Sequence, residues 1–274
     1  MPRSPYPPLK VLSQNFLRNE NQARELAGRI PLEPQDVVVE LGAGEGALTF
    51  FLAERVSRLL AVEIDKGLAR ELAERVKREG RNNIEVLHQD LMKADWPAWK
   101  EDLGKPYVLV GNLPYHISTP ILFKIIENRL HIRAAYIMLQ KEVADRLLAR
   151  PGTKAYGVIT VLIGYYAEVR PLMQLRPSAF FPKPKVSSTF VELRFRQAME
   201  PPLADEELFR WVARRAFAQR RKQLKNALIG DGRFSAEIVV KALEEEGIDP
   251  QGRGETLNVY QLAGLANTLV RLCG

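Results

Sequence analysis

Three glycines alternate with other residues in a stretch that directly follows an apolar run. The run covers residues 37–41 (VVVEL), and the glycines are Gly42, Gly44 and Gly46. Glycine allows the backbone to turn sharply and leaves no β-carbon between the chain and a ligand. A dinucleotide-binding loop has the spacing G-x-G-x-x-G, whereas here the third glycine comes one residue early. The stretch therefore predicts a cofactor-binding loop of another kind.

Acidic residues around this loop indicate the charge of the ligand. Glu40 and Glu45 lie beside the glycines, where negative charge would repel a diphosphate but suits the sulfonium and amino groups of S-adenosylmethionine. Glu63 ends the second apolar run, and a carboxylate there can accept hydrogen bonds from both ribose hydroxyls. Asp90 follows the third run and is placed to accept a hydrogen bond from the adenine amine. The sequence thus predicts an S-adenosylmethionine site.

A second motif, Asn112-Leu113-Pro114-Tyr115, follows the fourth apolar run. It resembles the (Asn/Asp)-Pro-Pro-(Tyr/Phe) signature of amino-methyltransferases, with leucine in place of the first proline. The adenine amine is a poor nucleophile because its lone pair is delocalised into the ring. Hydrogen bonds from its N–H groups to the Asn112 side-chain oxygen and to a carbonyl of Leu113 or Pro114 would favour a pyramidal nitrogen. Tyr115 could stack on a base turned out of its helix, and the transfer would be an in-line attack that needs no dedicated base.

The elements that must position these motifs alternate between apolar runs and amphipathic stretches, as in a doubly wound α/β sheet. We expect a mostly parallel, seven-stranded, Rossmann-like methyltransferase sheet. The expected strands are 37–41, 59–64, 84–88, 107–110 and 134–139, and the expected helices are 47–56, 66–79 and 141–149. Residues 158–170 and 189–195 are expected to supply the last elements, including an antiparallel closing hairpin.

The composition changes after residue 196. Residues 197–202 contain a Pro-Pro pair, which indicates a linker. Beyond it, Asp205 can cap a helix, and no strand pattern follows. We therefore expect a methyltransferase domain over residues 1–196, a linker over 197–202, and a small all-helical RNA- or ribosome-binding domain over 203–274.

Basic residues favour a polyanionic partner. The formal net charge is +7, and seven basic but no acidic residues lie between Leu208 and Gly230. If this stretch is one helix, four of the seven share a face that could neutralise phosphates without reading the RNA sequence. Two further lysines lie near residue 181. The expected RNA-contacting residues are Lys183, Lys185, Arg210, Arg214, Arg221, Lys222 and Lys225, and the face would carry Arg210, Arg214, Arg221 and Lys225.

Several classes of protein are disfavoured by composition. Cys273 is the only cysteine, so neither a disulfide framework nor a cysteine-based zinc site is possible. Three histidines without a clustered carboxylate pattern predict no bound metal. The proline-rich start lacks an apolar signal core, and no apolar run approaches the roughly 20 residues of a membrane span. We expect a cytoplasmic protein without a membrane association.

Ordered motifs along most of the chain resemble the ribosomal RNA adenine dimethyltransferase family, in its small-subunit branch. Two departures from the family pattern are His116, where many bacterial members have asparagine, and Ser13, which replaces a usual glycine. The resemblance implies that Asn15 and Leu17 line the cofactor and that Phe180 sandwiches the target adenine with Tyr115. The motifs that carry the resemblance are 14–17 (QNFL), 112–119 (NLPYHIST), 138–143 (MLQKEV), 179–186 (AFFPKPKV), 217–222 (FAQRRK) and 254–257 (GETL). The cofactor-lining set would be completed by Gly42, Gly44, Glu63, Asp90 and Asn112.

The resemblance also implies a reaction and a partner. Similar enzymes use S-adenosylmethionine to convert two adjacent adenosines near the 3′ end of 16S rRNA to N6,N6-dimethyladenosine, in four transfers on an immature small ribosomal subunit. We expect this chain to do the same as a monomer. Two alternatives remain open: a macrolide-resistance-type 23S rRNA adenine methyltransferase, and a largely non-catalytic ribosome assembly factor.

Overall fold

Two compact units make up the chain, whose computed structural model describes residues 15–220 and 222–273. The first unit is drawn from Met1–Ala144 and Val169–Phe195, and the second from Asp145–Glu168 and Arg196–Gly274. This division differs from the expected single boundary at residue 196, because residues 145–168 belong with the C-terminal part. Hydrogen bonds between these two segments explain the difference: the Gly152 amide donates to the Glu255 carbonyl at 2.8 Å, and the Tyr156 hydroxyl donates to the Leu257 carbonyl at 2.8 Å.

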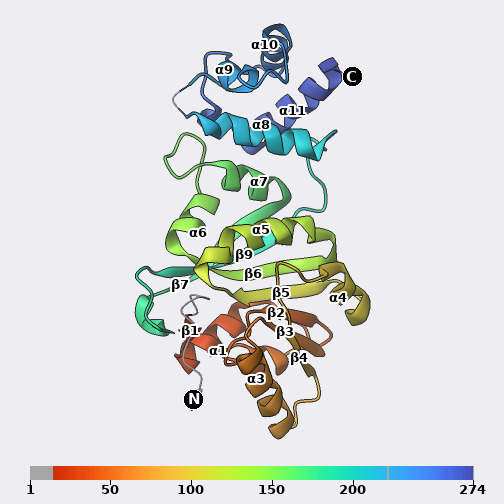
Figure 1. Cartoon of the computed structure of the whole chain (residues 1–274), viewed down its shortest axis with the longest axis vertical. Helices are drawn as coiled ribbons and strands as arrows, with labels where there is room; N and C mark the ends of the chain where they lie inside the picture. The colour runs from red at the N-terminus through yellow and green to blue at the C-terminus, as the bar shows by residue number, and fades with distance from the viewer. Residues whose placement is uncertain (1–14, 221, 274) are drawn as a thin grey trace. The chain divides into compact units, whose positions relative to one another are not determined.

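A seven-stranded sheet forms the centre of the first unit, in the order β4-β3-β2-β5-β6-β9-β7 (Figure 1). Neighbouring pairs from β4 to β6 are parallel, and β9 runs antiparallel to β6. The expected mostly parallel α/β fold is therefore confirmed. The strands are β2 (Val37–Leu41), β3 (Arg58–Glu63), β4 (Ile84–His88), β5 (Tyr107–Asn112), β6 (Ile132–Gln140), β7 (Ala167–Leu175) and β9 (Ser188–Phe195).

Helices cover both faces of this sheet. The chain moves outward from β2 to β4 and then, from β5 to β6, in the opposite direction. Right-handed crossovers therefore place α2 and α3 on one face and α5 on the other (Figure 1). The helical elements of this region are α1 (Glu20–Arg29), α2 (Thr49–Ala53), α3 (Lys66–Arg78), α4 (Trp96–Leu103), η2 (Tyr115–Ile117), α5 (Ser118–Glu127), η3 (Arg129–His131), α6 (Lys141–Leu147) and η4 (Pro177–Ala179).

The strand order reverses between β2 and β5, which are parallel neighbours. Ligands of open α/β sheets bind at such a reversal, outside the carboxyl ends of the strands. All five residues of β2 are buried, as are the first five of β5, because helices cover both faces. The glycine loop and Asn112 therefore emerge side by side from the core.

A small second sheet ties the beginning of the described chain to a distant segment. Strand β1 (Phe16–Leu17) pairs antiparallel with β8 (Phe180–Phe181). Leu17 and Phe180 are opposite each other and are both buried in the main core of the unit. The Arg18 amide extends the pairing by donating to the Ala179 carbonyl at 3.0 Å.

The second unit is helical except where it includes the start of β7. Residues 158–170, expected among the closing elements, begin as helix α7 and become strand only at Ala167. The residues of the expected linker are held by side chains: the Tyr165 hydroxyl donates to the Pro201 carbonyl at 2.6 Å. The elements are α7 (Val158–Tyr166), α8 (Glu206–Ala218), α9 (Leu224–Ile229), α10 (Ala236–Glu245), η5 (Gly254–Thr256) and α11 (Val259–Cys273).

No helix within the described ranges is long and apolar enough to cross a membrane. Over residues 15–220 and 222–273, no three His, Cys, Asp or Glu side chains gather in a group that could hold a metal ion.

Candidate functional site

The loop after β2 turns at glycines that have left-handed backbone conformations. Gly42 has φ 70° and Gly44 has φ 55°, a region that residues with a side chain rarely adopt. A β-carbon on Gly42 would lie 3.1 Å from Leu113, and one on Gly44 would lie 3.2 Å from Phe16. Glycine is therefore required both by conformation and by the close approach of neighbours. The amide of Gly42 donates to the Val62 carbonyl at 2.8 Å, which fixes the loop against β3.

Glu63, the last residue of β3, holds the glycine loop in place. One carboxylate oxygen accepts the Gly44 amide at 2.8 Å, and the other accepts the Asp65 amide at 2.9 Å. Burial raises the pKa of the Glu63 carboxyl, and these two hydrogen bonds oppose that effect. Each carboxylate oxygen can accept a second hydrogen bond, so the side chain can still receive ligand hydroxyls.

The structure corrects the expectation that Glu40 carries a negative charge beside the loop. Its side chain lies inside β2 and is 2% exposed. Burial, reinforced by the charge of Glu63, raises the pKa of Glu40 to about 8, so the carboxyl is mostly protonated at neutral pH. Glu45 is a half-buried loop carboxylate, and it lies 3.7 Å from the Arg18 guanidinium. The carboxyl groups that line the pocket beside the loop are therefore those of Glu45 and Glu63, not that of Glu40.

Asp90 lies beyond the end of β4, in a turn of its own. Its side chain accepts the Met92 amide at 2.9 Å and is 33% exposed. The turn is joined to β3 because the Gln89 amide donates to the Glu63 carbonyl at 2.9 Å. Asp90 is thus held near Glu63 and retains an accessible carboxylate oxygen.

Asn112 ends β5 and faces the segment before β1. Its side-chain nitrogen donates to the Asn15 carbonyl at 3.5 Å, so the amide oxygen is directed away from that contact. Leu113 is buried, and its neighbours Asn112 and Pro114 are half-buried. The Tyr115 hydroxyl shares a hydrogen bond of 2.6 Å with the Ser188 hydroxyl at the start of β9. This bond fixes the tyrosine ring, and burial raises the pKa of its hydroxyl.

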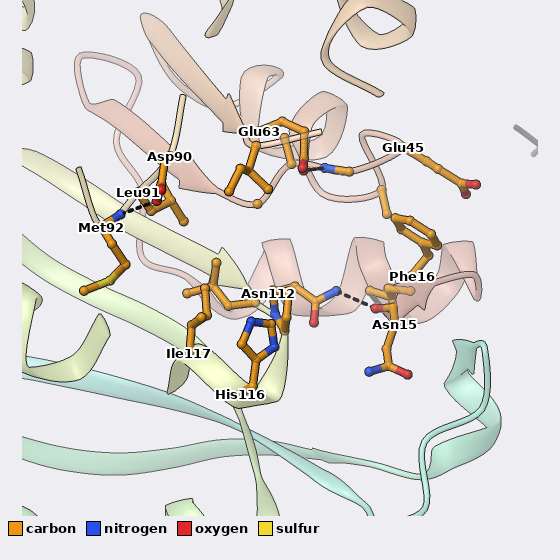
Figure 2. Close-up of a pocket in the computed structure, with 18 residues that line it drawn as sticks. Asn15, Phe16, Glu45, Glu63, Asp90, Leu91, Met92, Asn112, His116 and Ile117 are labelled. Carbon is orange, nitrogen blue, oxygen red and sulfur yellow. Dashed lines mark hydrogen bonds between the residues drawn. The ribbon is translucent and has the colours of Figure 1, made fainter. Parts of the chain in front are cut away.

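One pocket collects every cofactor residue that the sequence nominated. Figure 2 shows Glu63, Asp90 and Asn112 around this space, with Asn15 and Phe16 closing one side. The lining residues are Asn15, Phe16, Leu17, Gly42, Ala43, Gly44, Glu45, Ala47, Glu63, Ile64, Asp90, Leu91, Met92, Asn112, Leu113, Pro114, His116 and Ile117.

Several pocket residues were missed by sequence reasoning. Most are apolar, and some lie next to a nominated polar residue, as Leu91 does after Asp90 and Phe16 does after Asn15. Their types alone carry no chemical signal, but their positions at strand ends could have identified them. His116, one of the two departures from the family pattern, is exposed and lines the pocket.

The two expected aromatic partners of the target adenine lie outside this lining. Tyr115 is half-buried beside β9, whereas Phe180 is 5% exposed and belongs to the core. Its neighbour Phe181 is 48% exposed and contacts Arg18, whose guanidinium lies 4.2 Å from the ring centroid. The adjacent Lys183 and Lys185 are both exposed.

The basic stretch of the second unit is not one helix, so the expected single face is wrong. Helix α8 ends at Ala218, Gln219 leaves the helical conformation, and α9 begins only at Leu224. The break has long-range causes. The Arg220 guanidinium donates to the Lys154 and Tyr156 carbonyls.

Individual basic residues in this stretch also differ in exposure. Arg214 and Lys222 are exposed, and Lys225 is half-buried. Arg210 lies 3.8 Å from Glu206 and 3.6 Å from Glu207 in its own helix. Arg221 lies outside the described residues.

The pocket fits S-adenosylmethionine by its charge and shape. Three carboxylates, from Glu45, Glu63 and Asp90, line it, and its described lining contains neither lysine nor arginine. A diphosphate would be repelled by this set, whereas a sulfonium and an ammonium would be attracted. The backbone at Gly42 and Gly44 leaves the space that β-carbons would otherwise fill.

Comparisons with known proteins agree with this geometry. Among curated proteins, the Ribosomal RNA small subunit methyltransferase A of Geobacillus thermodenitrificans (strain NG80-2) is 41% identical over 271 residues, covering 96% of this chain and 91% of that protein. The protein of the same name from Bacillus cereus (strain B4264) is 40% identical over 267 residues, covering 95% and 91%.

Two solved structures are similar to this chain over most of its length. A dimethyladenosine transferase from Plasmodium falciparum has a TM-score of 0.80 at 25% identity, covering 91% of this chain and 95% of its own. The 23S rRNA methyltransferase ErmE has a TM-score of 0.71 at 28% identity, covering 93% and 100%. The family described as ribosomal RNA adenine dimethylase matches residues 10–269. The chain therefore belongs to the ribosomal RNA adenine dimethylase family.

Proposed function

We propose that this enzyme transfers methyl groups from S-adenosylmethionine to N6 of two adjacent adenosines near the 3′ end of 16S rRNA, giving N6,N6-dimethyladenosine at both. The observation that carries the proposal is the pocket at the strand-order reversal, where Asn112 lies beside the glycine loop and Glu63. The similarity to small-subunit methyltransferases at 40–41% identity supports the choice of RNA.

The donor supplies an electrophilic methyl group on a sulfonium sulfur when it is bound. Asn15, Leu17, Gly42 and Gly44 enclose it, and Glu63 and Asp90 accept hydrogen bonds from its adenosyl part. These residues contribute by orientation, which can replace much of the entropy cost of bringing two reactants together.

The target amine is held by the Asn112–Tyr115 motif in this proposal. Its two N–H groups donate to the Asn112 side-chain oxygen and to the carbonyl of Leu113 or Pro114. The nitrogen lone pair then attacks the methyl carbon, the carbon–sulfur bond breaks, and the nitrogen loses a proton to water. Tyr115 stacks on the base, and Phe180 supports the other side after a local rearrangement that exposes its ring.

The RNA is held outside the pocket by basic side chains, which release counterions when they contact phosphates. The proposed contacts are Lys183, Lys185, Arg210, Arg214, Arg221, Lys222 and Lys225. We assign the methyltransferase role to the first unit and RNA or ribosome binding to the second. The substrate is an immature small ribosomal subunit, the enzyme acts as a monomer, and the reaction takes place in the cytoplasm.

The 23S rRNA of the large subunit is the second candidate substrate, since ErmE shares the fold over 93% of this chain. Tritium-labelled donor, offered with purified small or large subunits that lack the modification, distinguishes the two. We expect label on two neighbouring adenosines of the small-subunit RNA, with two methyl groups each. Label on large-subunit RNA would favour the second candidate, and binding of small subunits without any transfer would favour a non-catalytic assembly factor.

A further inference from the structure

The turn that carries Asp90 belongs to no helix and no strand. Residues 90–94 connect β4 to the region before α4, and Leu91 and Met92 line the pocket. Within the turn, the Lys93 and Ala94 amides donate to the Asp90 carbonyl at 3.1 and 2.9 Å. The carbonyls of Leu91, Met92 and Ala94 have their hydrogen-bond partners outside the turn.

Two side chains outside the turn donate hydrogen bonds to these carbonyls. The Lys124 ammonium donates to the Met92 carbonyl at 2.8 Å and to the Ala94 carbonyl at 2.9 Å. The buried indole of Trp96 donates to the Leu91 carbonyl at 3.1 Å, and the Lys124 nitrogen lies 5.5 Å from the centroid of that ring. Lysine suits this place because its ammonium offers three donors on one atom.

Helix α5 connects Lys124 to the target-amine motif. The helix begins at Ser118, directly after η2, and η2 supplies His116 and Ile117 to the pocket. Ile117 is the N-cap of α5, and Lys124 is the seventh residue of the helix. The chain thus runs from the Asn112–Tyr115 motif through η2 into α5, and Lys124 of this helix contacts the Asp90 turn.

Two opposing effects act on the pKa of the Lys124 ammonium. Burial lowers the pKa of Lys124, and the carboxylates of Asp90, Glu127 and Asp95 act in the opposite direction. The ammonium also brings positive charge close to Asp90. A neutral apolar side chain of similar length would remove this charge and leave two carbonyls without their donor.

We propose that Lys124 is a positioning residue, which holds the Asp90–Met92 segment in the conformation that binds the adenosyl group of the donor. It links this segment to helix α5, which follows the target-amine motif and η2 along the chain. The inference rests on the proposed function, because it takes the ligand to be an adenosyl compound.

The test measures the Kd of S-adenosylhomocysteine by calorimetry, with no RNA and no turnover. We expect Lys124→Met to weaken binding about tenfold or more, because the turn loses two hydrogen bonds. Lys124→Gln, whose shorter amide can reach at most one carbonyl, is expected to weaken it several-fold and serves if the Met variant does not fold. The matched control is Lys105→Met, since Lys105 also donates to a backbone carbonyl, that of Gln35 at 2.7 Å, but lines no part of the pocket; its Kd should equal that of the wild type.

Two further readouts separate positioning from a general loss of structure. Amide hydrogen exchange should become faster at residues 91–94 in Lys124→Met and remain unchanged at residues 42–46. Affinity for small-subunit RNA should stay at the wild-type value. Asp90→Ala should also cost less affinity in the Lys124→Met background than alone, since both changes disable the same turn.

The outcomes are distinct. Wild-type affinity in both Lys124 variants, or equal losses of ligand and RNA binding, would overturn the inference while leaving the proposed function intact. A wild-type enzyme that does not bind S-adenosylhomocysteine would overturn the proposed function and, with it, this inference.

Discussion

The pocket of the first unit and the basic stretch of the second unit respond differently to reasoning from residue spacing. In the pocket, Gly42, Glu63, Asp90 and Asn112 are spread over 71 positions of the chain, yet they line one space. In the basic stretch, residues only a few positions apart do not share the face that helical spacing requires.

The difference follows from what fixes each region. Parallel strands bring their carboxyl ends to one edge whatever the sequence between them, so a residue after a strand has a defined place. A helix surface is defined only while the helix continues. Helix α8 ends at Ala218, and Arg220 instead contacts the carbonyls of Lys154 and Tyr156. These are long-range contacts that local periodicity does not contain.

Asn112→Ala tests the pocket most strongly. We expect transfer to fall about 10²–10³-fold, the range seen when one polar group aimed at a reacting centre is removed, because the amine loses an acceptor. Single-turnover transfer to small subunits measures this effect, and filter binding should show RNA affinity near the wild-type value. Asn82→Ala, an exposed change in the same unit, is the control, and an Asn112 variant as active as this control would remove Asn112 from the site.

Glu63→Gln should have the next largest effect. An amide nitrogen in place of one carboxylate oxygen would face either the Gly44 or the Asp65 N–H, and two donors cannot pair. We expect the Kd of S-adenosylhomocysteine to rise about 10- to 100-fold, or about 1.4–2.8 kcal/mol. Glu74→Gln on the exposed side of α3 is the control. Unchanged affinity in Glu63→Gln would mean that the pocket does not depend on this carboxylate.

Arg220→Ala and Lys222→Gln sharpen the contrast within the basic stretch. Arg220 donates to two carbonyls, so its loss should lower the free energy of unfolding by about 1–3 kcal/mol. Lys222 is exposed, so its loss should leave the melting temperature unchanged. It should instead reduce the salt slope of RNA binding by about 0.7–0.9, the share of one phosphate contact. The reverse pattern, with Lys222 stabilising and Arg220 setting the slope, would contradict the structure.

Glu40→Gln should change how the stability of the protein depends on pH. The carboxyl titrates near its ordinary 4.5 in the unfolded chain and about 8 in the folded one, so folding retains a proton. The stability that this proton provides is complete below about pH 4.5 and is lost as the pH rises through about 8. Glutamine mimics the protonated form at every pH. Denaturant unfolding should therefore show the variant gaining on the wild type by at most about 1.4 kcal/mol per pH unit. Parallel pH profiles would mean that Glu40 is not buried as a neutral acid.

Much of the sheet was predictable because apolar runs are short and unambiguous. The predicted strands 37–41 and 84–88 match β2 and β4 to the residue, and 107–110 and 134–139 fall inside β5 and β6. Helix α2 is shorter than the expected 47–56, since residues 47 and 48 continue the turn that follows the glycine loop and the helix ends at Ala53. The assignment of residues 145–168 to the second unit was not predictable, because it depends on contacts with residues more than 100 positions away.

Within the site, polar residues were easier to predict than their apolar neighbours. Glu63 ends β3 and Asp90 follows β4. A charged residue beside an apolar strand is unusual enough to be recognised in the sequence. Met92 and Ile117 have no such contrast with their surroundings, although they line the same pocket. The burial of Glu40 was missed because its strand is covered on both faces, which turns a carboxylate into a neutral acid.

The pairing of β1 with β8 has a consequence for biosynthesis. The pocket wall made by Asn15, Phe16 and Leu17 is anchored by residues 180–181, which a ribosome translates about 165 positions later. A nascent chain that has completed β2 to β5 already displays the glycine loop and Asn112, yet its opening stretch has nothing to pair with. The donor site is therefore finished late in translation, when nearly two-thirds of the polypeptide has been made.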